Sequence, residues 1–221
     1  MLSIPVVLIN KLNYQIMKTV SRLIMFMFAI GLIISCTPKP VKTIENLKAA
    51  YNGESTASAK YAAYAEKARA EGFDTVAVMF LATSKAEAIH AENHLKVLGK
   101  LGVKVDGPQI GTFDVMSTTE NLADAIKGES YEVETMYPGF ISAAETEKVK
   151  DAVKSFSWAN DTEIKHQAFY KKTLEALNAG GENGLPLNWM VCPVCGNTYD
   201  LASLPAACDF CMTKKEEFIA F

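Results

Sequence analysis

Four of the five cysteines stand close together near the end of the 221-residue chain, in the stretch CPVCGNTYDLASLPAACDFC. They form two C-x2-C pairs, Cys192 with Cys195 and Cys208 with Cys211. Four thiolates at this spacing are typical of a tetrahedral metal site, and such sites take zinc or iron. Two disulfides are the alternative, which export from the cell would favour. The spacing therefore predicts a small metal-binding module.

A second set of candidate ligands lies on segments with helical periodicity. The pattern Glu-x-x-His occurs twice, as Glu87–His90 and as Glu163–His166, and a Glu-x-x-Glu pair occurs as Glu129–Glu132. Residues at i and i+3 share one helix face, so both side chains of a pair can reach one metal centre. With Glu54 these pairs match the di-iron pattern of ferritin-like bundles, which takes one Glu from each of two helices and Glu-x-x-His from each of the others, with one extra Glu.

The elements that must position these side chains are helices. Apolar residues recur at steps of three and four, Thr43 is a candidate N-cap, Gly72 a stop, Gly180 and Gly181 end the last helix, and Pro138 should kink the third. The periodicity predicts four helices at about residues 43–72, 75–100, 118–145 and 147–179.

The five glutamates lie on the apolar stripes of these helices, whereas amphipathic helices normally place carboxylates on the solvent face. If the helices pair at the turns near Gly72 and at residues 145–148, the candidate ligands meet at about one level. Buried like charges are costly without counter-ions, and two divalent cations would offset most of this charge. The segment 101–118 is long enough to cross the length of the bundle. We therefore expect a mostly α protein, a ferritin-like four-helix bundle at residues 44–181, followed by a small four-cysteine metal domain at residues 187–221.

His94 lies one turn after His90 on the same stripe but has no counterpart on another helix. We interpret it as a core histidine or as a support for the ligands rather than as a ligand. Glu66, Glu71 and Glu92 fall off the stripes and are expected to be solvated.

The N-terminal segment differs from the rest of the chain. Residues 1–35 contain Lys11, Lys18 and Arg22 and no acidic residue. The apolar run Leu23–Ile34 corresponds to roughly 18 Å of helix, which suits a secretory signal better than a membrane span. The run leads into IISC, which resembles the lipobox of bacterial lipoproteins, where the cysteine is lipidated. We expect a signal peptide at 1–35, with 1–16 an upstream extension, lipidation at Cys36, a tether at 36–43, and export to a bacterial membrane surface. An uncleaved anchor, or a signal peptide with a coincidental cysteine, is the alternative.

Composition is that of a globular protein, with 49% hydrophobic and 21% charged residues. The formal net charge is −3, and no basic run is present. Both observations argue against a nucleic-acid partner.

With both ligand sets identified, residues 43–221 resemble the rubrerythrin family. The resemblance rests on AYNGESTASAKY, EAIH, GESYEVETMYPGF and EIKH in the four helices, and on the four-cysteine segment. That segment is similar to the rubredoxin-like tail of the family, so the resemblance implies a rubredoxin-like domain at residues 187–221. It implies reduction of hydrogen peroxide to water at a di-iron centre, with electrons passed on by a tetrathiolate iron. Family members form dimers in which one subunit's tail can approach the other's bundle.

The resemblance also implies roles for individual residues. Glu87 and Glu163 would bridge the irons, and Glu54 would bind one of them. Glu132 and His90 would serve that same iron alternately, in the oxidised and reduced states. The remaining implied roles are the second iron's ligands Glu129 and His166 and the neighbouring tyrosines Tyr61 and Tyr137.

Export would separate the protein from a cytosolic donor, so the electron donor is unidentified. Two other functions fit the residues: a ferroxidase or iron-handling protein, and a non-catalytic bundle whose zinc ribbon docks a partner.

Overall fold

The computed structural model describes residues 17–18 and 39–221. The predicted signal peptide, its upstream extension and Cys36 lie almost wholly outside the described residues, so they stay predictions. Residues 40–221 form one compact unit that includes both the helices and the four-cysteine segment. Within the described residues, no helix combines the length and the hydropathy needed to cross a membrane.

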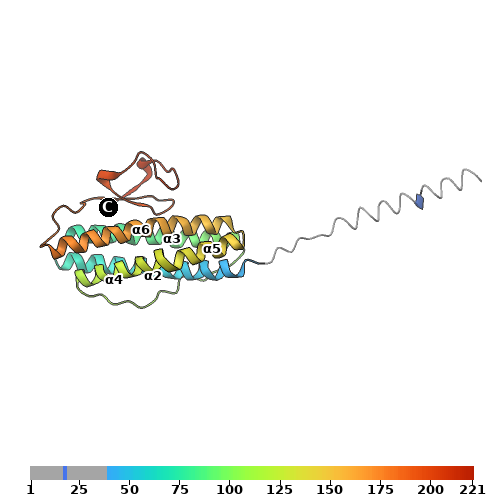
Figure 1. The fold of residues 1–221 in the computed structure, drawn as a ribbon, viewed down its shortest axis with the longest axis horizontal. Helices are drawn as coiled ribbons and strands as arrows, with labels where there is room; N and C mark the ends of the chain where they lie inside the picture. The colour runs from blue at the N-terminus through green and yellow to red at the C-terminus, as the bar shows by residue number, and fades with distance from the viewer. Residues whose placement is uncertain (1–16, 19–38) are drawn as a thin grey trace, which may run out of the picture. The chain divides into compact units, whose positions relative to one another are not determined.

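Four long helical segments make up the bundle (Figure 1). Three of them are single helices, and the third in chain order is divided by a short π-helix. The elements are α2 (Val41–Ala70), α3 (Asp74–Lys100), α4 (Thr118–Tyr131), the π-helix η1 (Glu132–Met136), α5 (Tyr137–Thr146) and α6 (Lys150–Asn178).

The start of α2 corrects the sequence prediction. The helix begins at Val41 rather than after Thr43, so the last residues of the predicted tether are helical and Thr43 is not the N-cap. The first amide groups of a helix need acceptors from outside it. Here the distant carboxylate of Glu147 accepts from the backbone N–H groups of Lys42 (3.1 Å) and Thr43 (2.7 Å). The local sequence could not reveal this cap, because Glu147 is distant in the chain and lies at the C-terminal end of α5.

The third helical segment is interrupted just before Pro138, the residue at which the sequence predicted a kink. The backbone N–H of Tyr137 donates to the carbonyl of Glu132, five residues earlier, which is the π-helical spacing. Pro138 follows directly and opens α5. Because proline has no N–H to continue an α-helical ladder, the change of register is placed in the turn before it.

The crossover between α3 and α4 is an extended segment that runs alongside α2. The sequence predicted a crossover of this kind. Residues 103–117 contain no helix or strand. The backbone N–H of Gln109 donates to Asn52 Oδ1 (3.0 Å), and that of Gly111 donates to Thr56 Oγ1 (2.9 Å). The crossover therefore returns the chain along the bundle, so that α4 begins beside the end of α2, where Thr118 N–H donates to Glu71 (2.8 Å), and runs parallel to α3.

The C-terminal segment forms a small antiparallel sheet in the order β2-β1-β3. Two single-turn 3₁₀ helices, at Leu201–Ser203 and Lys215–Glu217, complete it. The strands are β1 (Trp189–Val191), β2 (Thr198–Asp200) and β3 (Ile219–Ala220).

The bundle core consists of two apolar clusters that flank the level of the candidate ligands. One cluster includes Tyr61, Phe80 and Tyr170, and the other includes Leu47 and Phe156. Along each helix the ligands lie between members of the two clusters. The apolar side chains thus close both ends of the polar layer along the bundle.

Candidate metal centres

The structure brings the candidate ligands of the four helical segments into two overlapping sets. In each set, one potential ligand atom per residue lies within 4.8 Å of all the others. The two glutamates predicted as bridges, Glu87 and Glu163, belong to both sets. The sets are Glu54, Glu87, His90 and Glu163, and Glu87, Glu129, Glu163 and His166.

The two shared glutamates each face both imidazole rings. Glu87 places Oε2 3.0 Å from Nδ1 of His90 and Oε1 3.1 Å from Nδ1 of His166. Glu163 places Oε1 2.8 Å and Oε2 2.6 Å from the same two nitrogens. This symmetry is the arrangement that two bridging carboxylates require between two metal ions.

The donor atoms fit metal ions better than they fit one another. Buried polar atoms in proteins nearly always have a hydrogen-bond partner. Here a group of buried atoms in the cluster forms no well-aligned hydrogen bond with any described residue, although several of them face one another at 2.6–3.1 Å, and all but one of them point into the two ligand sets. These atoms are Glu54 Oε2, Glu87 Oε1, His90 Nε2, both carboxylate oxygens of Glu163, and His166 Nδ1. A pair of divalent cations would satisfy the oxygens and Nδ1, which leaves only Nε2 of His90 unexplained.

The tail fixes the tautomer of His166. Thr198 Oγ1 donates to the carbonyl of Gly196 (3.1 Å), so it can only accept from Nε2–H of His166 at 2.9 Å. The lone pair of His166 is therefore on Nδ1, the nitrogen that faces the glutamates. A hydrogen bond to the distal nitrogen is the usual way in which a protein orients a metal-binding histidine.

Both tyrosines implied by the resemblance contact the ligands. Tyr61 donates its hydroxyl proton to Glu129 Oε1 (2.5 Å), and Tyr137 donates to Glu54 Oε1. The two glutamates that each belong to only one ligand set are thus held by a tyrosine on their outer oxygen, and Glu54 keeps its other oxygen free for a metal.

Glu132 is placed apart from the ligands that the structure gathers. It belongs to neither set and is half-buried, at the start of η1, whereas His90 is fully enclosed in the first set. An alternation of these two residues on one iron stays a prediction, and the position of His90 corresponds to its predicted reduced state.

Burial and charge repulsion perturb the titration of this cluster in the absence of metal. Burial, reinforced by neighbouring carboxylates, raises the pKa values of Glu54 and Glu129 well above their ordinary range. Burial alone would lower the pKa of His90, but Glu163 and Glu87 raise it to about 10, and the same two residues raise the pKa of His166 to about 9. The metal-free cluster therefore binds more protons than the same groups do in the unfolded chain.

This proton excess gives the metal-free protein an expected pH dependence. Raised pKa values of acids and histidines add stability at low pH that is lost as pH rises through the folded-state values. Glu87 opposes this only below its ordinary pKa, because burial would raise its pKa but His166 and His90 lower it. We expect the melting temperature of metal-free protein to fall between pH 5.5 and pH 8.5. The free energy of unfolding should fall by about 1.4 kcal/mol per pH unit for each excess proton that the folded protein binds.

Thermal unfolding at fixed ionic strength measures this slope. The matched control is the double variant Glu54→Gln, Glu129→Gln, which keeps the shape of both side chains but removes two titrating groups. Its slope should be shallower, and metal-loaded wild type should lose most of the dependence because cations replace the protons. A rise in the stability of metal-free protein over this range would contradict the argument.

The four cysteines converge as the sequence predicted. Their sulfurs lie within 4.8 Å of one another, and all four thiols are free, so the structure does not form the alternative disulfides. Hydrogen bonds from the Cys192 and Cys195 thiols lower the pKa of the Cys208 thiol, which favours the thiolate that a metal binds. The cluster fits a tetrathiolate iron site of the rubredoxin type.

The chain is similar in sequence to known proteins. Residues 45–174 match the profile of the Rubrerythrin family. This chain belongs to the rubrerythrin family. It is 33% identical to nigerythrin from Nitratidesulfovibrio vulgaris over 81% of this chain and 86% of that protein. It is also 31% identical to rubrerythrin from Porphyromonas gingivalis over 78% of this chain and 86% of that protein.

Solved structures agree with the assignment to the rubrerythrin family. Fully reduced, all-ferrous nigerythrin superposes with a TM-score of 0.73 at 32% identity, covering 81% of this chain and 86% of that chain. A ferritin from Archaeoglobus fulgidus superposes with a TM-score of 0.57 at 17% identity over 64% of this chain and 88% of that chain, which shows the shared fold alone. The chain is thus a di-iron oxidoreductase of the rubrerythrin type with a ferritin-like bundle.

Sequence reasoning missed the residues of the tail that contact the bundle. Gly196 lies so close to His90 that a Cβ at this position would be 2.4 Å from Nε2. Lys165 donates to Asn197 Oδ1 (2.7 Å), and Asn93 donates to the carbonyl of Val194 (2.8 Å). The glycine after the first cysteine pair was the visible signal, but only the fold shows what the glycine approaches.

Proposed function

We propose that this protein reduces hydrogen peroxide to water at its di-iron centre, with electrons supplied through the four-cysteine iron of the tail. The overall change consumes one peroxide, two electrons and two protons and gives two waters. The observation that carries the proposal is the contact of one tail loop, Gly196–Thr198, with the distal nitrogens of both metal-site histidines.

This contact supports electron delivery rather than a purely structural tail. Cys195 is followed directly by Gly196, whose backbone packs against the ring of His90. Thr198, two residues further, accepts the hydrogen bond from His166. A short route of bonded and contacting atoms therefore joins a thiolate of one metal site to an imidazole of the other. A zinc ribbon that only docks a partner would not need its metal-binding loop beside the two histidines of the other metal site.

Peroxide as substrate is supported by family membership and by the burial of the ligand layer. When bound, the iron pair supplies the two-electron redox chemistry. The chain's own residues hold the ligands, exclude bulk water and keep hydroxyl donors beside the carboxylates. Tyr61 and Tyr137 each present a proton at the edge of the site. The electron donor remains to be found, and we expect a homodimer as in the family resemblance.

Rapid mixing of fully reduced protein with hydrogen peroxide or with dioxygen tests the proposal. We expect oxidation of the di-iron centre by peroxide to be at least tenfold faster than by dioxygen, followed by oxidation of the tail iron as it re-reduces the centre. Faster reaction with dioxygen and storage of added Fe(II) would favour a ferroxidase instead. Zinc in the tail of native protein would overturn the relay but leave the di-iron centre.

A further inference from the structure

His94 is fully buried and is not part of either ligand set, yet both of its ring nitrogens are hydrogen-bonded. Nδ1 lies 2.8 Å from Ser155 Oγ on α6, and Nε2 lies 3.2 Å from the hydroxyl of Tyr137 on α5. Tyr137 in turn donates to Glu54. A continuous chain of hydrogen bonds therefore runs from Ser155 to a ligand of the di-iron centre.

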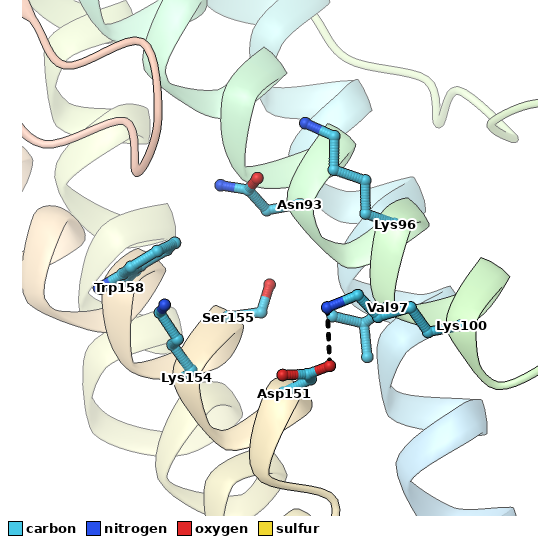
Figure 2. Close-up of a pocket in the computed structure, with 8 residues that line it drawn as sticks. All are labelled: Asn93, Lys96, Val97, Lys100, Asp151, Lys154, Ser155 and Trp158. Atoms are coloured by element: carbon cyan, nitrogen blue, oxygen red, sulfur yellow. Dashed lines mark hydrogen bonds and ion pairs between the residues drawn. The ribbon is translucent and has the colours of Figure 1, made fainter. Parts of the chain in front are cut away.

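The outer end of this chain lies in a pocket. Ser155 lines an open cavity of about 360 Å³ between α3 and α6, and Figure 2 shows it between side chains of both helices, with Asn93 and Lys96 on one side and Trp158 on the other. The cavity admits water, because several charged and polar side chains line it. The chain of hydrogen bonds thus begins at a pocket open to solvent and ends at the buried ligands of the di-iron centre.

The direction of each hydrogen bond can be deduced. Tyr137 uses its single proton toward Glu54, so its oxygen must accept from Nε2–H of His94. Burial, with a smaller contribution from the charge of His90, lowers the pKa of His94 to about 3, so the ring is neutral and Nδ1 carries a lone pair. Ser155 must then donate to Nδ1. Every proton in the chain consequently points from the pocket toward the di-iron centre.

We propose that Ser155, His94 and Tyr137 form a proton path from this pocket to the di-iron centre. The proposal rests on the proposed function, in which each peroxide consumes two protons from solvent. In one passage, pocket water gives a proton to Ser155 Oγ, and Ser155 gives its own proton to Nδ1 of His94. His94 releases its Nε2 proton to Tyr137, and the hydroxyl proton of Tyr137 moves along its hydrogen bond toward Glu54 and ends in product water.

No electron moves in these steps, and the net transfer is one proton. No side chain in the path needs to hold a lasting charge, because each releases one proton as it gains another. Rotation of the hydroxyls and tautomer exchange of the ring restore the starting arrangement. Ser155 and His94 are thereby positioned to supply protons. The electrons arrive by a different route, through the tail loop that contacts His90 and His166.

A pair of variants of equal shape tests the path. Ser155→Val replaces the hydroxyl by a methyl group, whereas Ser155→Thr keeps the hydroxyl and adds the same bulk. Neither leaves space for a water that could replace the hydroxyl. Thr173→Val is the matched control, because Thr173 is a buried residue of α6 whose hydroxyl also bonds to α3, at Met79, away from the path.

The first readout needs no turnover. In full-length protein carrying zinc at both metal sites, NMR of ¹⁵N-labelled histidine measures how fast the ring N–H of His94 exchanges with D₂O. We expect Ser155→Val to slow this exchange at least tenfold, and Ser155→Thr and Thr173→Val to stay within about twofold of wild type. Equal exchange in Ser155→Val and Ser155→Thr would overturn the path.

The second readout is peroxide turnover of the iron-loaded protein in H₂O and in D₂O. Ser155→Val should lower kcat about a hundredfold, the lower end of the range for lost general acid catalysis, and increase the solvent isotope effect, with unchanged iron content. An unchanged kcat and isotope effect in Ser155→Val would also overturn the path. If wild type itself fails to reduce peroxide, the proposed function fails, while the exchange measurement still decides whether the path conducts protons.

Discussion

Replacing Glu87 with alanine is expected to empty the bundle of iron. This glutamate belongs to both ligand sets, and its two oxygens face the two histidines separately. Its loss removes a ligand from each metal ion and leaves His90 and His166 with Glu163 as their one remaining shared partner among these glutamates. We expect metal analysis to show loss of about two irons per chain, the complement of a di-iron centre, with the tail iron and its visible absorption retained.

Glu92→Ala is the matched control, because Glu92 lies on the same helix but is exposed, and its one ion pair within the described part of the chain is with Lys96, at 3.5 Å. It should keep all of its iron.

Two further variants test the predicted alternation. Glu132→Ala should still load ferrous ions but destabilise the oxidised centre, because the harder Fe(III) favours a carboxylate, whereas His90→Ala should weaken the reduced centre. Equal iron loss in Glu87→Ala, Glu132→Ala and His90→Ala would mean that all three are static ligands.

The second large effect is expected from Gly196→Ala in the tail. A Cβ here would lie 2.4 Å from Nε2 and 2.6 Å from Cδ2 of His90, and 3.1 Å from the carbonyl of Ala86. His90 is buried and held by two glutamates, so the tail must move away instead. Electron transfer slows steeply with distance, and we expect the reduced tail iron to re-reduce the oxidised centre at least tenfold more slowly than in wild type.

Gly184→Ala separates this contact from backbone strain. Gly184 has φ +79° and Gly196 has φ +84°, so alanine is strained at both positions, but no atom of residues 17–18 or 39–221 lies within 4 Å of a Cβ at Gly184. The rate of tail oxidation after a peroxide pulse, followed by visible absorption, should fall only in Gly196→Ala. Equal rates in the two variants would argue that the loop contact does not carry the electrons.

The helices, the candidate ligands and the four-cysteine module could be predicted from the sequence alone. The reason is that these depend on local rules: apolar residues at steps of three and four define a helix face, and Glu-x-x-His places two ligands on that face. Glutamates on apolar stripes indicated a buried charged layer, and the structure encloses Glu54, Glu87 and Glu163 almost completely. The C-x2-C pairs likewise predicted the convergence of four sulfurs.

The tertiary structure alone decided which distant atoms meet. The cap of α2 by Glu147, the π-helical turn before Pro138 and the contact of Gly196 with His90 all depend on how separate elements pack. His94 shows the difference most clearly. Its position on the stripe predicted burial, but its bonds to Ser155 and Tyr137 join residues 61 and 43 positions away. Such bonds have no period in the sequence, because they are set by the distance between helices in the folded bundle.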